Sequence, residues 1–457
     1  MFIKKLKSDN NLKNLNKYYL TRSNNLSGSI KVPGDKSISQ RALIVSLISS
    51  GTTIIEDILD SEDVYHTMKA IIQLGATLKV SKGYIEVKGV GLGNLKSPKS
   101  PIYMGNSGTG TRLLLGLVAG SNALVTFYGD SSLTERPMDR IIMPIEEMGA
   151  RIVCSDNKKL PITVLGARAK GFTLPINYKL EIPSAQIKSA ILLAALSAKG
   201  TSFITEYKKS RNYTEKMLSE RGVILKNKKV NKYKNIISVN GTSLVKPKNI
   251  KVPGDPSSAA FLSVAALITK KSSIIIENVL YDKFRLDIFN ILKKMGAFIN
   301  IIREGKNTCK IIVKSSMLKN ITIESKNSSA LIDEYPILSI AASSAEGTMI
   351  MKGLGELRYK ESDRFSAIVE GLHKSGADVR SFEDNIIIKG KKKIKGGCII
   401  DAKNDHRISM SFNILSLITE EPIFVRGNKS IITSFPDFFK NLNELGADSA
   451  IYGKQKN

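Results

Sequence analysis

A repeated junction along the chain restricts its possible fold more than any other feature. Six times, an amphipathic helical stretch ends in Gly-Ala or Gly-Val, and a β-like run follows. The glycines are 74, 73, 74, 80 and 70 residues apart: Gly75, Gly149, Gly222, Gly296, Gly376 and Gly446. This period is longer than the roughly 20 to 50 residues of a solenoid repeat and shorter than a typical domain of about 100 to 150 residues. The chain is therefore expected to repeat one α/β unit.

The fourth repeat shows the pattern inside such a unit. Phe284, Ile288, Ile291 and Met295 recur at helical spacing and form one apolar face. Gly296 then stands where a left-handed helix cap is expected. The runs 298–302 and 310–313 resemble β-strands on either side of a polar loop. Six units of this kind predict sheets packed on buried helices.

A longer duplication indicates how the units are grouped. Residues 31–37 read KVPGDKS, and residues 251–257, which lie 220 positions later, read KVPGDPS. The offset is three units, so we expect two similar domains, joined near these two Pro-Gly sites. One domain is expected to contain residues 1–34 and 253–457, and the other residues 35–252. A cleft between domains is the usual place for a ligand, and the active site is expected there.

Charge and cysteine content restrict the function only weakly. The 69 Lys and Arg residues exceed the 41 Asp and Glu residues by 28, which suggests an anionic partner: nucleic acid, a membrane surface or a phosphorylated small molecule. A codon bias towards AT-rich sequence gives the same excess. The three cysteines, Cys154, Cys309 and Cys398, have no metal or redox spacing, which favours the reducing cytoplasm.

Neither a membrane span nor a signal peptide is expected. The apolar runs fall well short of the roughly 18 residues that suggest a span, and residues 1–26 are basic and rich in asparagine, without an apolar core. These first residues predict a partly disordered tail.

Two polar clusters stand at predicted helix starts and suit an anion. Lys36, Ser37 and Arg41 open a predicted helix, where free N–H groups and the helix dipole favour negative charge. The second copy of the motif has Pro256 and Phe261 in place of the lysine and the arginine, so only the first is equipped for this chemistry. The sequence GNSGTGTR at 105–112 predicts a glycine-rich turn before the apolar helix 113–119. It is neither a Walker loop nor a dinucleotide motif, and on its own a structural turn explains it better than an anion site does.

Five further clusters combine charged or polar groups with helix starts. Arg136 precedes a predicted helix, residues 404–407 open another, and Lys360 and Arg364 lie four apart on one predicted helical face. These three also fit solvated, salt-bridged surfaces. The polar run 184–189 leads into an apolar helix, and the acidic pair at 333–334 precedes the apolar run 337–342.

Together these segments resemble the 5-enolpyruvylshikimate-3-phosphate synthase family. The matching motifs extend from Ser27 to about Gly446 and are PGDKSISQRA, GNSGTGTR, LTERPMDR, SAQIKSA, SRNYTEKML, LIDEYPIL, RYKESDR, NDHRISM and TSFPDF. The resemblance implies a two-domain inside-out α/β barrel of six βαβαββ repeats, three in each domain. It also implies a shikimate-pathway enzyme without a cofactor or metal, which we expect to be a cytoplasmic monomer that binds no nucleic acid or membrane.

The reaction implied by the resemblance joins two anions. The 5-hydroxyl of shikimate 3-phosphate attacks the central carbon of phosphoenolpyruvate while the methylene carbon is protonated. The tetrahedral intermediate then loses phosphate and a methyl proton.

The resemblance also implies a role for individual residues. Asp333 is similar to the general base on the 5-hydroxyl, Glu361 to the acid that exchanges the methylene proton, and Lys36 to a cation that contacts both substrates. The implied shikimate 3-phosphate set is Lys36, Ser37, Arg41, Ser184, Ala185, Gln186, Arg211, Asp333 and Lys360. The implied phosphoenolpyruvate set is Lys36, Gly108, Arg136, Gln186, Arg364 and Arg407, and Asn106 and His406 are expected nearby.

The chain is most similar to the branch of the family that includes glyphosate-tolerant members. It has Ser184-Ala185-Gln186 where Ser-Ser-Gln is commoner, and Thr433 where the commoner branch has a lysine. Tolerant members have alanine at the position of Gly108, however, and this chain keeps glycine. We therefore expect glyphosate to compete with phosphoenolpyruvate, and to do so less strongly after Gly108→Ala.

Two alternatives fit parts of the sequence. UDP-N-acetylglucosamine enolpyruvyl transferase shares the fold and chemistry, but it has Lys-Asn in place of Lys36-Ser37 and a loop cysteine that no cysteine here matches. A nucleic-acid-binding repeat protein would explain the net charge and the basic stretch 389–395, although that stretch has no aromatic residues for stacking on bases.

Overall fold

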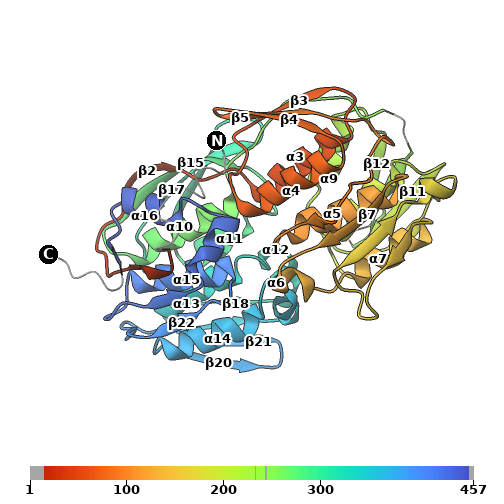
Figure 1. Ribbon diagram of the computed structural model, residues 1–457. Helices are drawn as coiled ribbons and strands as arrows, with labels where there is room; N and C mark the ends of the chain where they lie inside the picture. The colour runs from red at the N-terminus through yellow and green to blue at the C-terminus, as the bar shows by residue number, and fades with distance from the viewer. Residues whose placement is uncertain (1–14, 232, 242–243, 452–457) are drawn as a thin grey trace. The chain divides into compact units, whose positions relative to one another are not determined.

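The computed structural model describes residues 15–231, 233–241 and 244–451 (Figure 1). These residues form two compact units. The continuous unit runs from Lys36 to Val252, and the discontinuous unit combines the described residues up to Asp35 with the segment that starts at Pro253.

The described residues form five four-stranded sheets and two two-stranded sheets. All five larger sheets have the same pairing. An outer strand pairs in parallel with a second strand, which pairs antiparallel with a hairpin of two later strands. No sheet of these residues closes into a barrel, so the barrel in the expected fold is not borne out as a closed one, and the sheets are separate.

In the continuous unit, three sheets surround three buried helices. The sheets have the orders β14-β3-β5-β4, β6-β7-β9-β8 and β10-β11-β13-β12. The elements are α3 (Lys36–Leu47), β3 (Thr52–Glu56), α4 (Glu62–Gln73), β4 (Thr77–Ser81), β5 (Tyr84–Lys88), β6 (Ile102–Tyr103), α5 (Gly108–Ala119), β7 (Leu124–Tyr128), α6 (Ser131–Thr134), α7 (Asp139–Glu147), β8 (Arg151–Val153), β9 (Ile162–Leu165), η2 (Ala167–Lys170), β10 (Asn177–Lys179), α8 (Ala185–Ala195), β11 (Thr201–Glu206), α9 (Tyr213–Ser219), β12 (Leu225–Lys229), β13 (Asn235–Asn240) and β14 (Ile250–Lys251).

The discontinuous unit has two four-stranded sheets, β16-β17-β15-β2 and β18-β19-β21-β20, and the pairs β22-β23 and β1-β24. Its elements are η1 (Leu15–Lys17), β1 (Tyr18–Leu20), β2 (Ser27–Lys31), α10 (Pro256–Ile268), β15 (Ser273–Leu280), α11 (Asp287–Lys294), β16 (Phe298–Arg303), β17 (Thr308–Lys314), β18 (Thr322–Ile323), η3 (Ser325–Asn327), α12 (Ser328–Leu331), α13 (Tyr335–Ser344), β19 (Thr348–Met351), η4 (Gly355–Tyr359), α14 (Arg364–Lys374), β20 (Asp378–Phe382), β21 (Asn385–Lys389), β22 (Ile399–Asp401), α15 (His406–Ser416), β23 (Phe424–Arg426), η5 (Asn428–Thr433), α16 (Phe438–Glu444) and β24 (Ser449–Ile451).

The central helices are buried because small residues let them approach closely. In the continuous unit, a Cβ added to Gly116 of α5 would lie 2.2 Å from the carbonyl oxygen of Ala190 in α8. In the discontinuous unit, α10, α13 and α15 contact one another, and nearly all their residues are buried. Apolar burial of this extent is the main favourable contribution to folding.

The six junction glycines share one backbone conformation. Their φ angles lie between 82° and 114°, a region that only glycine occupies easily. Each follows an amphipathic helix of one segment: α4, α7, α9, α11, α14 or α16. The left-handed cap predicted at Gly296 is confirmed, with a φ of 93°.

The segment that ends the chain differs from the other five. Strands β22 and β23 form only a parallel pair, and β24 pairs antiparallel with β1 near the start of the chain. The expected disordered tail is therefore wrong for residues 15–26, because Leu20 and Leu26 are fully buried. The rest of that prediction falls on residues 1–14, outside the described part.

The two units exchange their first strands. Strand β2 directly precedes α3 in the chain but pairs with β15 of the discontinuous unit. Strand β14 directly precedes α10 but pairs with β3 of the continuous unit. The two connections between units are consequently Val32–Asp35 and Val252–Asp255, the two Pro-Gly-Asp motifs.

Among the described residues, no helix has both the length and the apolar character needed to cross a membrane.

Candidate active site

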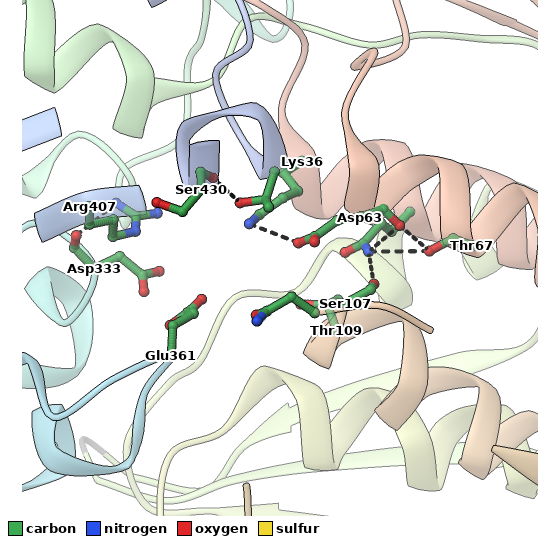
Figure 2. Close-up of polar contacts among 12 residues, drawn as sticks. Lys36, Asp63, Thr67, Ser107, Thr109, Asp333, Glu361, Arg407 and Ser430 are labelled. Carbon is green, nitrogen blue, oxygen red and sulfur yellow. Dashed lines mark hydrogen bonds and ion pairs between the residues drawn. The ribbon is translucent and has the colours of Figure 1, made fainter. Parts of the chain in front are cut away.

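In the continuous unit, the first two turns of α3 carry two cations with defined partners. Lys36 Nζ lies 3.0 Å from Asp63 Oδ2 of α4, and Figure 2 shows the two side chains directed at each other. Arg41 is only 3% exposed. Its Nε donates to Thr214 Oγ1 at 2.9 Å, and Nη2 donates to Ser189 Oγ of α8 at 3.3 Å.

The glycine-rich segment forms the start of α5, one turn earlier than expected. The predicted turn at 105–112 is wrong from Gly108 onward, where α5 begins. Ser107, which precedes the helix, accepts a hydrogen bond from Gln40 Nε2 of α3 at 2.5 Å. Arg136 donates to the side-chain oxygen of Asn106, so two residues that were expected separately at the site are brought together.

The start of α8 is joined to the start of α5. Ser184 caps α8, and its hydroxyl accepts from the backbone N–H of Ile187 at 3.4 Å. Gln186 Oε1 accepts from Arg112 at 2.7 Å, and Gln186 Nε2 donates to Thr109 at 2.9 Å. The first turns of α3, α5 and α8 therefore form one cluster, which we call the anion cluster. Its predicted members are Lys36, Ser37, Arg41, Asn106, Gly108, Arg136, Ser184, Ala185 and Gln186.

The anion cluster combines two sources of positive potential. Helix N-termini present unpaired N–H groups, and Lys36, Arg41 and Arg136 add full charges. Arginine forks match the oxygens of a carboxylate or phosphate group. Arg211 lies half-buried in the loop between β11 and α9.

In the discontinuous unit, a fully buried arginine forms ion pairs with three carboxylates. Arg364 opens α14 and is 0% exposed. Its Nε lies 2.8 Å from Asp405 Oδ2, its Nη2 lies 2.7 Å from Glu361 Oε2, and its Nη1 lies 3.6 Å from Asp333 Oδ1. Asp333 and Glu361, the two carboxylates predicted to transfer protons, thus both pair with Arg364, which is predicted to bind an anion.

Arg364 stays charged in this setting. Burial lowers the pKa of its guanidinium, but the carboxylates of Asp405 and Glu361 raise it more strongly, so the pKa lies above its ordinary value. A permanently charged fork of this kind can attract an anion but cannot serve as a proton donor.

Arg407 is the second predicted arginine of this unit. Its Nη1 donates to the backbone oxygen of Asp333 at 2.7 Å and lies 3.8 Å from Glu334 Oε1. Figure 2 shows Arg407 beside Asp333. His406 is buried one residue earlier, at the start of α15. We call Asp333, Glu361, Arg364, Asp405 and Arg407 the carboxylate cluster.

Lys360 does not lie on a helix with Arg364. Residues 360–363 precede α14, and the Asp363 side chain caps the helix by accepting from Ser366 N at 3.0 Å. The predicted helical face is therefore wrong, because the capping aspartate starts the helix at Arg364. Lys360 lies half-buried after η4.

Sequence reasoning missed the partners that orient these groups. Asp63, Ser189, Thr214 and Arg112 hold Lys36, Arg41 and Gln186, and they come from other helices. A capping role for Asp405 could have been predicted from the sequence, because an aspartate before an apolar helix is a capping signal. It accepts from the N–H of Arg407 at 2.9 Å while it pairs with Arg364.

The three thiols lie outside both clusters. All three cysteines are free, and burial raises the pKa of the Cys309 thiol to about 11. No group of His, Cys, Asp and Glu residues in the described segments could hold a metal ion.

Comparison with known proteins decides the family. The family model of EPSP synthase (3-phosphoshikimate 1-carboxyvinyltransferase) matches residues 20–442. The chain belongs to the EPSP synthase family.

Similar proteins match the chain over most of its length. The 3-phosphoshikimate 1-carboxyvinyltransferase of Chelativorans sp. (strain BNC1) is 42% identical over 434 residues, which cover 93% of this chain and 96% of the relative. That of Zymomonas mobilis is 43% identical over 433 residues, covering 93% and 95%.

Solved structures are also similar to this chain over most of its length. The EPSP synthase of Acinetobacter baumannii has a TM-score of 0.82 at 37% identity and covers 96% of this chain and 99% of its own. The enolpyruvyl transferase NikO from Streptomyces tendae has a TM-score of 0.75 at 15% identity, which shows a shared fold alone. The family match favours EPSP synthase over the two alternatives weighed from the sequence.

Proposed function

We propose that the anion cluster and the carboxylate cluster contribute different groups to one reaction. In that reaction the enolpyruvyl group of phosphoenolpyruvate is transferred to the 5-hydroxyl of shikimate 3-phosphate. The observation that carries the proposal is the placement of Asp333 and Glu361 around one buried arginine, Arg364. Membership of the EPSP synthase family over residues 20–442 supports the substrates and the reaction type.

The anion cluster suits shikimate 3-phosphate. Ser37, Arg41, Ser184, Ala185 and Gln186 offer hydroxyl, amide and guanidinium donors at the starts of α3 and α8, which is the chemistry that a phosphate and ring hydroxyls require. Arg211 and Lys360 are proposed as further contacts. Gly108 and Arg136 are assigned to phosphoenolpyruvate, together with Lys36 and Gln186, which contact both substrates.

The carboxylate cluster suits proton transfer. Asp333 removes the proton of the 5-hydroxyl as its oxygen attacks C2 of phosphoenolpyruvate, and Glu361 delivers a proton to the methylene carbon. The tetrahedral adduct then breaks its C–O bond to phosphate and loses one methyl proton. Arg364 and Arg407 bind the anionic groups of phosphoenolpyruvate, and Lys36 assists the proton transfers.

The domain arrangement is proposed at a finer level than the family match. Six βαβαββ repeats, three in each domain, with helices inside and sheets outside, fit the common pairing of the five larger sheets. The proposed domains are residues 1–34 with 253–457 and residues 35–252.

Phosphate release from phosphoenolpyruvate in the presence of shikimate 3-phosphate tests the function. We expect activity in the unaltered chain and losses of about 10²- to 10⁴-fold in Asp333→Asn and Glu361→Gln, the usual contribution of general acid–base catalysis. Glu370→Gln is the matched control, because Glu370 lies on the exposed side of α14 and pairs only with lysines in the described contacts. Full activity in both cluster variants would refute the assigned roles.

A further inference from the structure

The two Pro-Gly-Asp motifs lie side by side in the discontinuous unit. The N–H of Asp35 donates to the oxygen of Pro253 at 2.8 Å, and the N–H of Asp255 donates to the oxygen of Pro33 at 2.9 Å. Gly254 permits this approach, because an added Cβ would lie 2.8 Å from both Val32 Cγ2 and the backbone oxygen of Asn278. The two connections between the units therefore leave the discontinuous unit together.

One buried arginine forms an ion pair with the aspartate of each motif. Arg285 Nη1 lies 2.5 Å from Asp35 Oδ2, and Nη2 lies 2.5 Å from Asp255 Oδ1. The arginine is 4% exposed and Asp35 is 0% exposed. Buried ion pairs contribute little net stability, but they are costly to break, so they fix geometry.

The same arginine connects to the carboxylate cluster. Arg285 Nη2 donates to Ser257 Oγ at 2.9 Å, and Ser257 Oγ donates to Glu334 Oε1 at 2.5 Å. That carboxylate oxygen lies 3.8 Å from Arg407 Nη1, which in turn donates to the backbone oxygen of Asp333. A continuous polar chain thus runs from Asp35 to Asp333.

We propose that Arg285 is a positioning residue for the transfer reaction. It fixes Asp35, whose next residue is Lys36, and through Ser257 and Glu334 it holds Arg407 against Asp333. Arg285 is buried, and we assign it no contact with a substrate. The inference rests on the proposed roles of Lys36, Asp333 and Arg407.

This role explains what the duplicated motifs share. Both copies have the aspartate, and Arg285 binds both. They differ at the next position, where the first has Lys36 and the second has Pro256, which opens α10. Ser37 and Ser257 occupy equivalent positions, and the second serine links Arg285 to Glu334.

The first test compares two arginines in the full chain. Arg285→Met is expected to lower kcat by about 10²-fold, the cost of a displacement of about 1 Å at reacting groups, with Arg285→Lys in between. Binding of shikimate 3-phosphate alone is expected to change little. Arg221→Met is the control: Arg221 is 1% exposed and donates to the backbone oxygens of Met217 and Lys248. We expect it to lower the unfolding temperature and to leave kcat of the folded protein unchanged.

Ser257→Ala interrupts the polar connection between Arg285 and Glu334 without removing a charge. It should fold even if Arg285→Met does not, and should lower kcat by about tenfold, the rate equivalent of one hydrogen bond to a charged group. The inference is overturned if Ser257→Ala retains full kcat, or if the kcat of folded Arg285→Met matches that of Arg221→Met. Lys36→Met and Asp333→Asn are measured in parallel. Unchanged activity in those two would refute the proposed site instead.

Discussion

Gly108 is the position at which one methyl group should most disturb an anion contact. A Cβ added there would lie 2.7 Å from Arg136 Nη1, so the guanidinium that binds Asn106 would have to move. Because Arg136 is 7% exposed, it has little room to do so. We therefore expect Gly108→Ala to raise KM for phosphoenolpyruvate and to raise the inhibition constant of glyphosate by a larger factor.

Steady-state kinetics at varied phosphoenolpyruvate and glyphosate concentrations measure both constants. KM for shikimate 3-phosphate serves as the internal control, because neither Arg41 nor Ser184 is among the atoms nearest the added Cβ. Equal glyphosate constants in the two proteins would contradict the expectation.

Individual site residues were predictable where they belong to a sequence motif, but the side chains that they contact were not. Lys36 and Arg41 follow from the first Pro-Gly-Asp motif and the helix start. Asp63 and Thr214 lie 27 and 173 residues from the cations they hold. No local pattern reports such pairs, since only the folded arrangement of α3, α4 and α9 brings them together.

At the scale of elements, α8 is fixed by a buried charge triad. Lys188 Nζ lies 3.0 Å from Glu206 Oε2 at the end of β11 and 2.8 Å from Glu215 Oε1 of α9. Lys188→Met would leave two carboxylates without their buried cation. We expect the free energy of unfolding to fall by about 3 to 5 kcal/mol, as when one partner of a buried pair is removed.

Urea unfolding of the variant measures this loss. Lys248→Met is the control, because Lys248 pairs with Glu220 at 3.4 Å while both side chains are about half exposed. Surface pairs contribute about 0 to 1 kcal/mol. Similar losses in both variants would show that the buried triad does not stabilise α8.

Element types were predictable, whereas some helix starts were not. The six amphipathic helices and their glycine caps follow from the periodicity. The start of α5 at Gly108 runs against the low helix propensity of glycine. Crowding explains this glycine-rich first turn, because a Cβ on Gly110 would lie 2.6 Å from Thr67 Oγ1 and 2.7 Å from Ser107 Oγ. Close approach of neighbouring side chains here outweighs local propensity.

At the scale of the whole molecule, the strand partners of β2 and β14 were beyond the sequence. Each of the two strands leads into the same Lys-Val-Pro-Gly-Asp run, so the local sequence does not distinguish which strand each one pairs with. Their pairing with β15 and β3 is set by long-range burial in each unit. The duplication predicts two domains joined near these two motifs, and that division stays a prediction.

The start of the chain also stabilises a helix almost 400 residues later. Leu20 of β1 is fully buried, and its backbone oxygen accepts from Ser416 Oγ of α15 at 2.6 Å. The oxygen of Tyr18 accepts from Asn428 Nδ2 at 2.9 Å. Because α15 begins with His406 and Arg407, loss of β1 should loosen the helix that presents the second arginine of the carboxylate cluster.

Deletion of residues 1–20 is therefore expected to lower both stability and activity. Loss of the Leu20 side chain alone should cost about 2 to 5 kcal/mol, the range for truncating a buried leucine. Deletion of residues 1–14 is the matched control, since it removes none of these contacts. Thermal unfolding and phosphate release, measured on both truncated proteins, distinguish the outcomes. If the two deletions give the same unfolding temperature and kcat, β1 does not hold α15, because only the longer deletion removes Tyr18 and Leu20.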